Sequence, residues 1–217
     1  ENMTNEAAIL AVRRGQRIIT MRDFDDAIDR VMVGLERSGK KVSEEERKLV
    51  AYHETGHALL TELLEGMQRT HKVTIIPRGR AGGYSIPIPK EERMMVTKQD
   101  LLDQLVYILG GRAAEEVFLE DISTGASNDL QKATNIARKM VTKYGMSERL
   151  GHLVLGQQNS EHVFLGRDIG HERNYSEEVA AQIDKEVKRI IDESYDKART
   201  VLTENSDMVE RMVDALY

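Results

Sequence analysis

Cysteine and tryptophan are absent from this sequence of 217 residues, and proline occurs only three times. Without cysteine the chain has no disulfides, no thiolate nucleophile and no zinc site built on thiolates, so any metal must be held by His, Asp or Glu. Apolar runs of the roughly 18–20 residues that cross a bilayer are missing, as is a signal-peptide pattern, and we expect the chain to be soluble as it stands. The formal net charge of −6 provides no basic surface, which argues against a nucleic-acid partner.

Most of the sequence has apolar residues at the spacing typical of α-helices. With 40% hydrophobic and 31% charged residues, its composition is ordinary for a helix-rich globular protein. Apolar residues recur at helical spacing, and two short β-branched runs interrupt them, which predicts a mainly α fold with a small β-sheet. Residues 1–40 resemble two short helices followed by a polar boundary, and so small a hairpin buries little by itself. We therefore expect a remnant of a larger unit at 1–40 and the main domain at 41–217.

The segment Ala51–Leu59 carries the pattern His-Glu-x-x-His. His53 and His57 are four residues apart, so on a helix both imidazoles lie on one face and can hold one zinc ion. Glu54 follows the first histidine, and its carboxylate would project beside the metal, where it can take a proton from a zinc-bound water. Zinc lowers the pKa of such a water to about 7. The pattern predicts a hydrolytic zinc site with Glu54 as the general base.

Helix-capping residues and glycines predict that this motif lies in a closely packed helix. Ser43 and Glu46 form a capping-box pattern that predicts a helix beginning just after Ser43. Gly56 in the helix interior costs roughly 1 kcal/mol against alanine, and its missing side chain would let another segment approach closely. A second helix is predicted from Thr97, with Gly110–Gly111 in its middle. We interpret this glycine pair as a close helix crossing rather than as a helix end.

Two short strands are predicted between these helices, at residues 72–76 and 82–86. Prolines bound both of them, which marks sheet edges. An edge strand beside a peptidase metal is a natural place for an extended polypeptide to add by backbone hydrogen bonds. The alternative is a small sheet that only covers the helices. The candidate substrate-binding residues are Gly82, Gly83, Tyr84, Ser85 and Ile86.

A catalytic zinc needs a third protein ligand and an open position. The other histidines of the chain lie in loop-like stretches typical of solvated surface residues; they are His71, His152, His162 and His171. Glu115 and Glu116 lie on a predicted helix, where some peptidases place their third ligand. Asp129 lies in the first turn of a helix for which Ser127 is the predicted N-cap, although an acid there is also stabilised by the helix dipole alone. These patterns leave Glu115, Glu116 and Asp129 open as the third ligand.

Several stretches of the sequence occur in the order and at the spacing of one known family. They are Asn5–Ala8 (NEAA), Asp23–Asp29 (DFDDAID), Ala51–Ala58 (AYHETGHA), Gly110–Glu116 (GGRAAEE), Ser123–Asp129 (STGASND) and Ala133–Arg138 (ATNIAR). From Thr4 onward the chain resembles the peptidase part of the FtsH family, the membrane-anchored ATP-dependent AAA+ zinc proteases of bacteria. The resemblance implies a helical zinc-peptidase domain in which Asp129 joins His53 and His57 as the third zinc ligand.

The resemblance also implies a larger assembly around this chain. Residues 1–40 resemble the end of the small helical subdomain of an AAA+ module, while the ATP-binding motifs and transmembrane helices of the family are absent from this sequence. The chain would then be a C-terminal fragment whose ATP-driven motor and membrane anchor lie in a missing part. The family further implies a homohexameric ring, attachment to the bacterial cell membrane with the peptidase on the cytoplasmic side, and substrates that are unfolded or membrane-extracted polypeptides.

Three hypotheses for the function follow. In the first, the chain is a zinc endopeptidase in which Glu54 activates water for peptide-bond hydrolysis. In the second, it is a ring-forming scaffold or chaperone-like domain with a structural metal, although such a metal would not need Glu54. In the third, the metal serves a small-molecule hydrolase, which a closed pocket would favour. Tyr84 and His71 are candidate oxyanion stabilisers only because they lie near the predicted edge strand in sequence.

Overall fold

The structure, a computed structural model, describes residues 2–36, 42–65, 67, 69–79, 82–87, 95–156 and 175–217. Within these ranges the helices are α1 (Asn2–Arg13), α2 (Met21–Met32), α3 (Glu44–Leu63), α4 (Lys98–Leu119), a 3-10 turn η1 (Thr124–Ala126), α5 (Ser127–Thr142), α6 (Glu177–Glu204) and α7 (Ser206–Leu216). The strands are β1 (Thr70–Thr74) and β2 (Tyr84–Pro87). The predicted mainly α fold with a small sheet is confirmed. None of the helices in the described part of the chain combines the length and the hydrophobicity of a transmembrane span.

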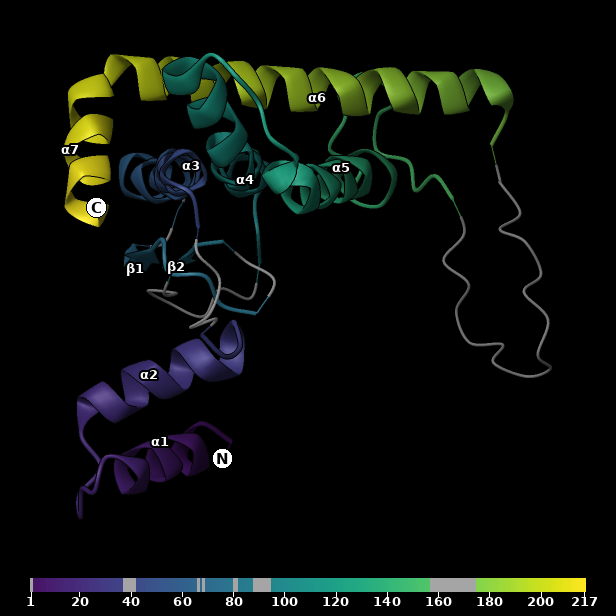
Figure 1. The fold of residues 1–217 in the computed structure, drawn as a ribbon. Coiled ribbons are helices and arrows are strands. Elements are labelled where there is room, and N and C mark those ends of the chain that lie inside the picture. The colour runs from purple at the N-terminus through teal and green to yellow at the C-terminus, as the bar shows by residue number, and fades with distance from the viewer. Residues whose placement is uncertain are drawn as a thin grey trace, which may run out of the picture.

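The helices and the sheet form successive layers (Figure 1). The long helix α6 runs along one side of the molecule, and α3, α4 and α5 lie side by side beneath it. The β1–β2 hairpin lies on the side of α3 that faces away from α6, and α2 and α1 follow beyond the hairpin. The predicted boundary at residues 40 and 41 falls outside the described residues. The sheet therefore separates the N-terminal helices from the helical layers.

The crossing of α3 and α4 organises the core. A Cβ atom added at Gly56 would lie 2.9 Å from the carbonyl carbon of Gly110 and 2.8 Å from the Cβ of Ala114, so only glycine fits there. In the same way, a Cβ at Gly110 would lie 2.9 Å from the carbonyl oxygen of Gly56. Helix α4 continues through the glycine pair without a break. The predicted close crossing is confirmed, with α3 as the partner helix.

The ends of these helices follow local hydrogen bonds. The Ser43 hydroxyl accepts a bond from the Glu46 amide at 3.1 Å and caps α3, as predicted. The prediction of Ser127 as an N-cap was wrong by one position, because Ser127 has helical angles (φ −58°, ψ −41°) and is the first residue of α5. The turn η1 leads directly into α5, and the capping hydroxyl is that of Ser123 before η1. Asp129 nevertheless lies in the first turn of α5.

The two strands form an antiparallel pair with Val73 opposite Ser85 and Thr74 opposite Tyr84. The first strand ends at Thr74 rather than at the predicted position 76, because the Ile76 amide donates to the Thr74 hydroxyl at 3.1 Å and not to a partner strand. The second begins at Tyr84, two residues later than predicted. Among the described residues no strand pairs with the other side of β2.

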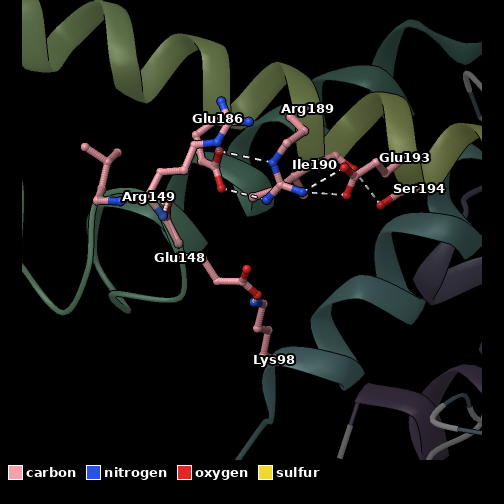
Figure 2. A network of polar contacts seen from close by, with 10 residues as sticks. Lys98, Glu148, Arg149, Glu186, Arg189, Ile190, Glu193 and Ser194 are labelled. Atoms are coloured by element: carbon pink, nitrogen blue, oxygen red, sulfur yellow. Dashed lines mark hydrogen bonds and ion pairs between the residues drawn. The ribbon is translucent and has the colours of Figure 1, made fainter.

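A polar network supports α6 far from the sheet (Figure 2). The Glu186 side chain is fully buried and accepts from Arg189 one turn later, at 2.6 and 3.1 Å. Arg149, in the segment after α5, lies 3.7 Å from the same carboxylate, and its neighbour Glu148 lies 3.2 Å from Lys98 at the start of α4. Burial of a carboxylate is tolerated here because it is paired with guanidinium groups.

Candidate metal centre

Three side chains from two helices converge on one point. His53 and His57 of α3 direct their Nε2 atoms at each other, 3.1 Å apart. The Oδ2 atom of Asp129, from the first turn of α5, lies 3.5 Å from the first and 3.6 Å from the second. Among the described residues this is the group of acids and histidines compact enough to hold a metal ion. The α3 spacing brings the rings together, and the η1 turn brings the carboxylate to them.

The outer nitrogen of each imidazole is fixed by an acceptor on α4. The Nδ1–H of His57 donates to the backbone carbonyl of Tyr107 at 2.9 Å. Since a carbonyl only accepts, this bond leaves the lone pair of His57 on Nε2. The Nδ1 of His53 lies 2.7 Å from Glu115, whose carboxylate is likewise an acceptor. Both rings are therefore held in the tautomer that offers Nε2 to a metal.

Of the three acids that the sequence left open, only Asp129 faces the two Nε2 atoms. Glu115 is fully buried behind His53, and its carboxylate also accepts bonds from the backbone amide and hydroxyl of Ser123, at 2.7 and 3.1 Å. Glu116 points toward α6, where it accepts from the hydroxyl of Tyr195. The structure thus places Glu115 where it orients the candidate ligand His53, and Glu116 where it joins α4 to α6.

The separations among the donor atoms fit a tetrahedral zinc. Ligand atoms about 2.0–2.1 Å from zinc at tetrahedral angles lie about 3.3–3.4 Å apart, close to the 3.1, 3.5 and 3.6 Å found between the three side chains. Gly111 of α4 forms the floor of this space. A Cβ added there would lie 2.6 Å from the Nε2 atoms of both His53 and His57, and it would fill the space beside the donors.

The charges around the centre keep Asp129 ionised. Burial alone would raise its pKa, but the favourable interaction with the two nearby histidines outweighs burial and holds the pKa well below its usual range. Burial disfavours the charged form of His53, yet Asp129 and Glu115 prevail and raise its pKa to about 9. A metal would take the place of that proton, because metal ligands bind in their deprotonated forms. Lys132 pairs with the other oxygen of Asp129 at 3.2 Å.

Glu54 lines a cleft next to these donors. The cleft has a volume of about 980 Å³, and its lining includes the three candidate ligands and Glu54. The Glu54 side chain is only 8% exposed. Burial raises its pKa, although the nearby His57 and His53 oppose this rise. A carboxylate with a raised pKa is suited to accept and return a proton near neutral pH.

The start of β2 forms the wall of the cleft beside Glu54. A Cβ at Gly83 would lie 2.9 Å from the Cγ of Glu54 and 2.6 Å from the carbonyl oxygen of Thr74, so the backbone at Gly83 packs directly against the Glu54 side chain. Of the predicted substrate-binding residues, Ile86 is not part of the cleft lining. The others line it, namely Gly82, Gly83, Tyr84 and Ser85.

The remaining residues singled out in the sequence have other neighbours. Tyr84 is buried, and burial together with the nearby Asp29 carboxylate raises the pKa of its hydroxyl to about 12. His71 is exposed on β1 and lies 3.9 Å from Asp25 of α2. His152 is exposed, whereas His162 and His171 fall outside the described residues.

Sequence reasoning missed Tyr107. Its ring centroid lies 5.4 Å from that of His57, and its side chain lines the cleft. The available signal was its spacing on α4, since Tyr107, Gly111 and Glu115 follow one another at intervals of four residues and share a helix face. That signal becomes informative only when one of the three residues is known to face the candidate ligands.

Comparisons with known proteins agree with this geometry. The sequence profile of Peptidase family M41 matches residues 40–217. The chain is 61% identical over 216 residues to the ATP-dependent zinc metalloprotease FtsH of Halothermothrix orenii, covering 100% of this chain and 34% of that protein. It is 50% identical to the protein of the same name from Bacillus subtilis, again covering 100% of this chain and 34% of the relative. The chain spans about a third of the length of these curated relatives.

Proposed function

The chain belongs to peptidase family M41, and on this premise we propose that it is a zinc-dependent endopeptidase unit in which His53, His57 and Asp129 hold the metal. The observation that carries the proposal is the convergence of their donor atoms to within 3.1–3.6 Å of one another. The acid Glu54 from the same helix lines the same cleft. Three protein ligands leave the fourth position of a tetrahedral zinc open, as catalytic sites require.

Glu54 performs the proton transfers in this mechanism. When bound, zinc supplies an acidified water and polarises the scissile carbonyl. The Glu54 carboxylate accepts the proton of the attacking water and then donates it to the nitrogen of the departing amine. Burial raises the pKa of Glu54, which makes its carboxylate a stronger base toward the attacking water. The acceptors on α4 hold His53 and His57 in place throughout, so the histidines themselves transfer no proton.

The substrate is proposed to be an extended polypeptide lying along β2. The side of β2 away from β1 pairs with no other strand among the described residues, and its backbone groups can bond an added chain. Gly82 and Gly83 keep the cleft wall free of side chains at its closest approach to Glu54. A small-molecule hydrolase is less favoured, because a free strand edge beside a cleft of about 980 Å³ suits a polymer.

The scaffold hypothesis accounts less well for the same residues. A purely structural zinc is closed by four protein ligands, whereas the compact group among the described residues has three. A scaffold also gives no reason for a buried carboxylate on Glu54 beside the metal donors.

The complete protein is proposed to be an ATP-dependent protease, because the relatives named above are described as ATP-dependent and this chain covers about a third of their length. Residues 1–40 would be the end of the ATPase module, and residues 41–217 the peptidase domain. Degradation of unfolded or membrane-extracted proteins, a homohexameric ring and a place on the cytoplasmic side of the cell membrane stay predictions from the family resemblance.

The test is cleavage of a fluorogenic unstructured peptide by the zinc-loaded chain, beside a chelated sample and Glu54→Gln. Loss of a general base typically lowers the rate ~10²–10⁴-fold, so Glu54→Gln should be nearly inactive while its zinc content equals that of the parent. Parental cleavage by Glu54→Gln would refute the assigned role of Glu54. Undiminished cleavage after zinc is removed would refute the metal mechanism.

A further inference from the structure

A buried carboxylate connects α2 to the sheet that walls the cleft. Asp29 lies on α2, outside the residues matched by the M41 profile, and only 1% of it is exposed. Its Oδ2 atom is 2.5 Å from the ammonium of Lys72 on β1 and 3.7 Å from the guanidinium of Arg78, which follows β1. Asp29 of the N-terminal helix pair α1–α2 therefore forms ion pairs with two bases of the peptidase domain.

Backbone contacts extend this junction. The Gly79 amide donates to the carbonyl of Leu35 at 3.0 Å, and Glu36 and Arg78 pair as an isolated β-bridge. Gly79 has a φ of +53°, and a Cβ there would lie 2.5 Å from the carbonyl oxygen of Val33. The segment after α2 and the loop after β1 therefore touch without intervening side chains.

The junction lies a few residues from the catalytic base. Lys72 and Thr74 belong to β1, whose register holds Thr74 opposite Tyr84 on β2. The next residue before Tyr84 is Gly83, which packs between the Thr74 carbonyl and the side chain of Glu54. The connection from Asp29 to Glu54 thus runs through one ion pair, one short strand pair and one backbone contact.

We propose that Asp29 is a positioning residue for the peptidase, which holds the β1–β2 hairpin against Glu54 from outside the peptidase domain. Removal of its charge breaks the ion pair between α2 and Lys72 and leaves Arg78 paired with Glu36, so β1 loses its buried ionic contact with α2. The start of β2 then shifts relative to Glu54, and the substrate that β2 carries shifts with it. This inference rests on the proposed peptidase function for its effect on catalysis, but the position of β2 can be measured independently of catalysis.

The decisive variant is Asp29→Asn, which keeps the shape of the side chain and removes its charge. The matched control is Glu186→Gln, since Glu186 is another fully buried carboxylate paired with a base, on α6 and outside the cleft (Figure 2). Both substitutions should lower thermal stability. Only Asp29→Asn should also speed amide hydrogen exchange in β2 and lower kcat/KM, by about tenfold or more, because a misplacement near 1 Å can cost about 10²-fold.

Zinc content serves as the second readout and should equal that of the parent in both variants. The reason is that the metal donors on α3 and α5 do not touch the junction. Lys72→Met removes the other partner of the ion pair and carries the test if Asp29→Asn does not fold. Parental β2 exchange and parental kcat/KM in a folded Asp29→Asn or Lys72→Met would overturn the positioning role. If the zinc-loaded parent cleaves nothing, the proposed peptidase function fails, and exchange in β2 alone decides whether Asp29 positions the hairpin.

Discussion

Substitution of Gly111 by alanine should separate folding from metal binding. Gly111 lies inside α4, where alanine is the better helix former by up to about 1 kcal/mol. The added Cβ, however, would lie 2.5 Å from Cε1 of His53 and 2.6 Å from Nε2 of both His53 and His57, whereas ordinary contacts begin at 3.4 Å. The imidazoles must therefore retreat by about 0.8 Å, the difference between 2.6 and 3.4 Å.

A displacement of this size is incompatible with the metal site. Zinc ligands tolerate deviations of about 0.2 Å from their normal bond lengths. The two rings cannot move freely either, because Glu115 and the Tyr107 carbonyl hold their outer nitrogens at 2.7 and 2.9 Å. We expect zinc affinity to fall by about 100-fold or more, at the upper end of the effect seen when a ligand loses its support. Peptide cleavage should fall with it.

The assay is competition for zinc with a chromogenic chelator, combined with circular dichroism and chemical unfolding of the metal-free chain. Gly110→Ala is the matched control, since its Cβ would meet Leu60 and the Gly56 carbonyl rather than the histidines. That control should lower the free energy of unfolding and weaken zinc binding much less than Gly111→Ala does, because it strains the helix crossing without placing an atom beside the histidine nitrogens. Parental zinc affinity in Gly111→Ala would refute the proposal that the ligand atoms and the α4 backbone share this space.

Two further predictions concern buried carboxylates. Glu115→Gln should weaken zinc binding about 10–100-fold in the same competition assay. A glutamine amide has one oxygen and one NH₂ group, so its NH₂ must face either the Nδ1–H of His53 or the Ser123 amide, and both of these are donors. A zinc affinity equal to that of the parent would contradict this prediction. For Glu186, pairing with Arg189 lowers the folded-state pKa, so its contribution to stability is complete above the carboxyl pKa of the unfolded chain and is lost as pH falls through the folded-state value. The difference in urea unfolding free energy between the parent and Glu186→Gln should therefore be largest at neutral pH and shrink on acidification, and a constant difference would contradict the pairing.

Local signals in the sequence were sufficient for the elements that carry the site. Ser43 starts α3, and the spacing of His53 and His57 places both rings on one face, because both effects act within a single helix. The glycines of α4 predicted a close crossing for the same reason, since a missing side chain is a local property. What these signals could not give is the partner of each element.

The third ligand illustrates this limit. Glu115, Glu116 and Asp129 are all acids on helices, and their chemistry is equally suited to zinc. The choice among them depends on which face of α4 meets α3 and on how η1 aims the first turn of α5, both of which are tertiary properties. The family resemblance pointed to Asp129, and the structure brings it to 3.5 and 3.6 Å from the histidines. The role of Asp29 was invisible for the same reason, since its partners lie more than forty residues away.

The arrangement on α4 explains why the crossing and the metal centre depend on each other. Gly110 and Ala114 contact Gly56 and set the distance between α3 and α4. The adjacent stripe of Tyr107, Gly111 and Glu115 then meets the two histidines with a carbonyl, an open space and a carboxylate. The two stripes belong to the same helix and lie about 100° apart around its axis. A shift or rotation of α4 that moves one stripe therefore moves the other. A chain that loosened the crossing would lose the orientation of both ligands, even with every donor atom still present.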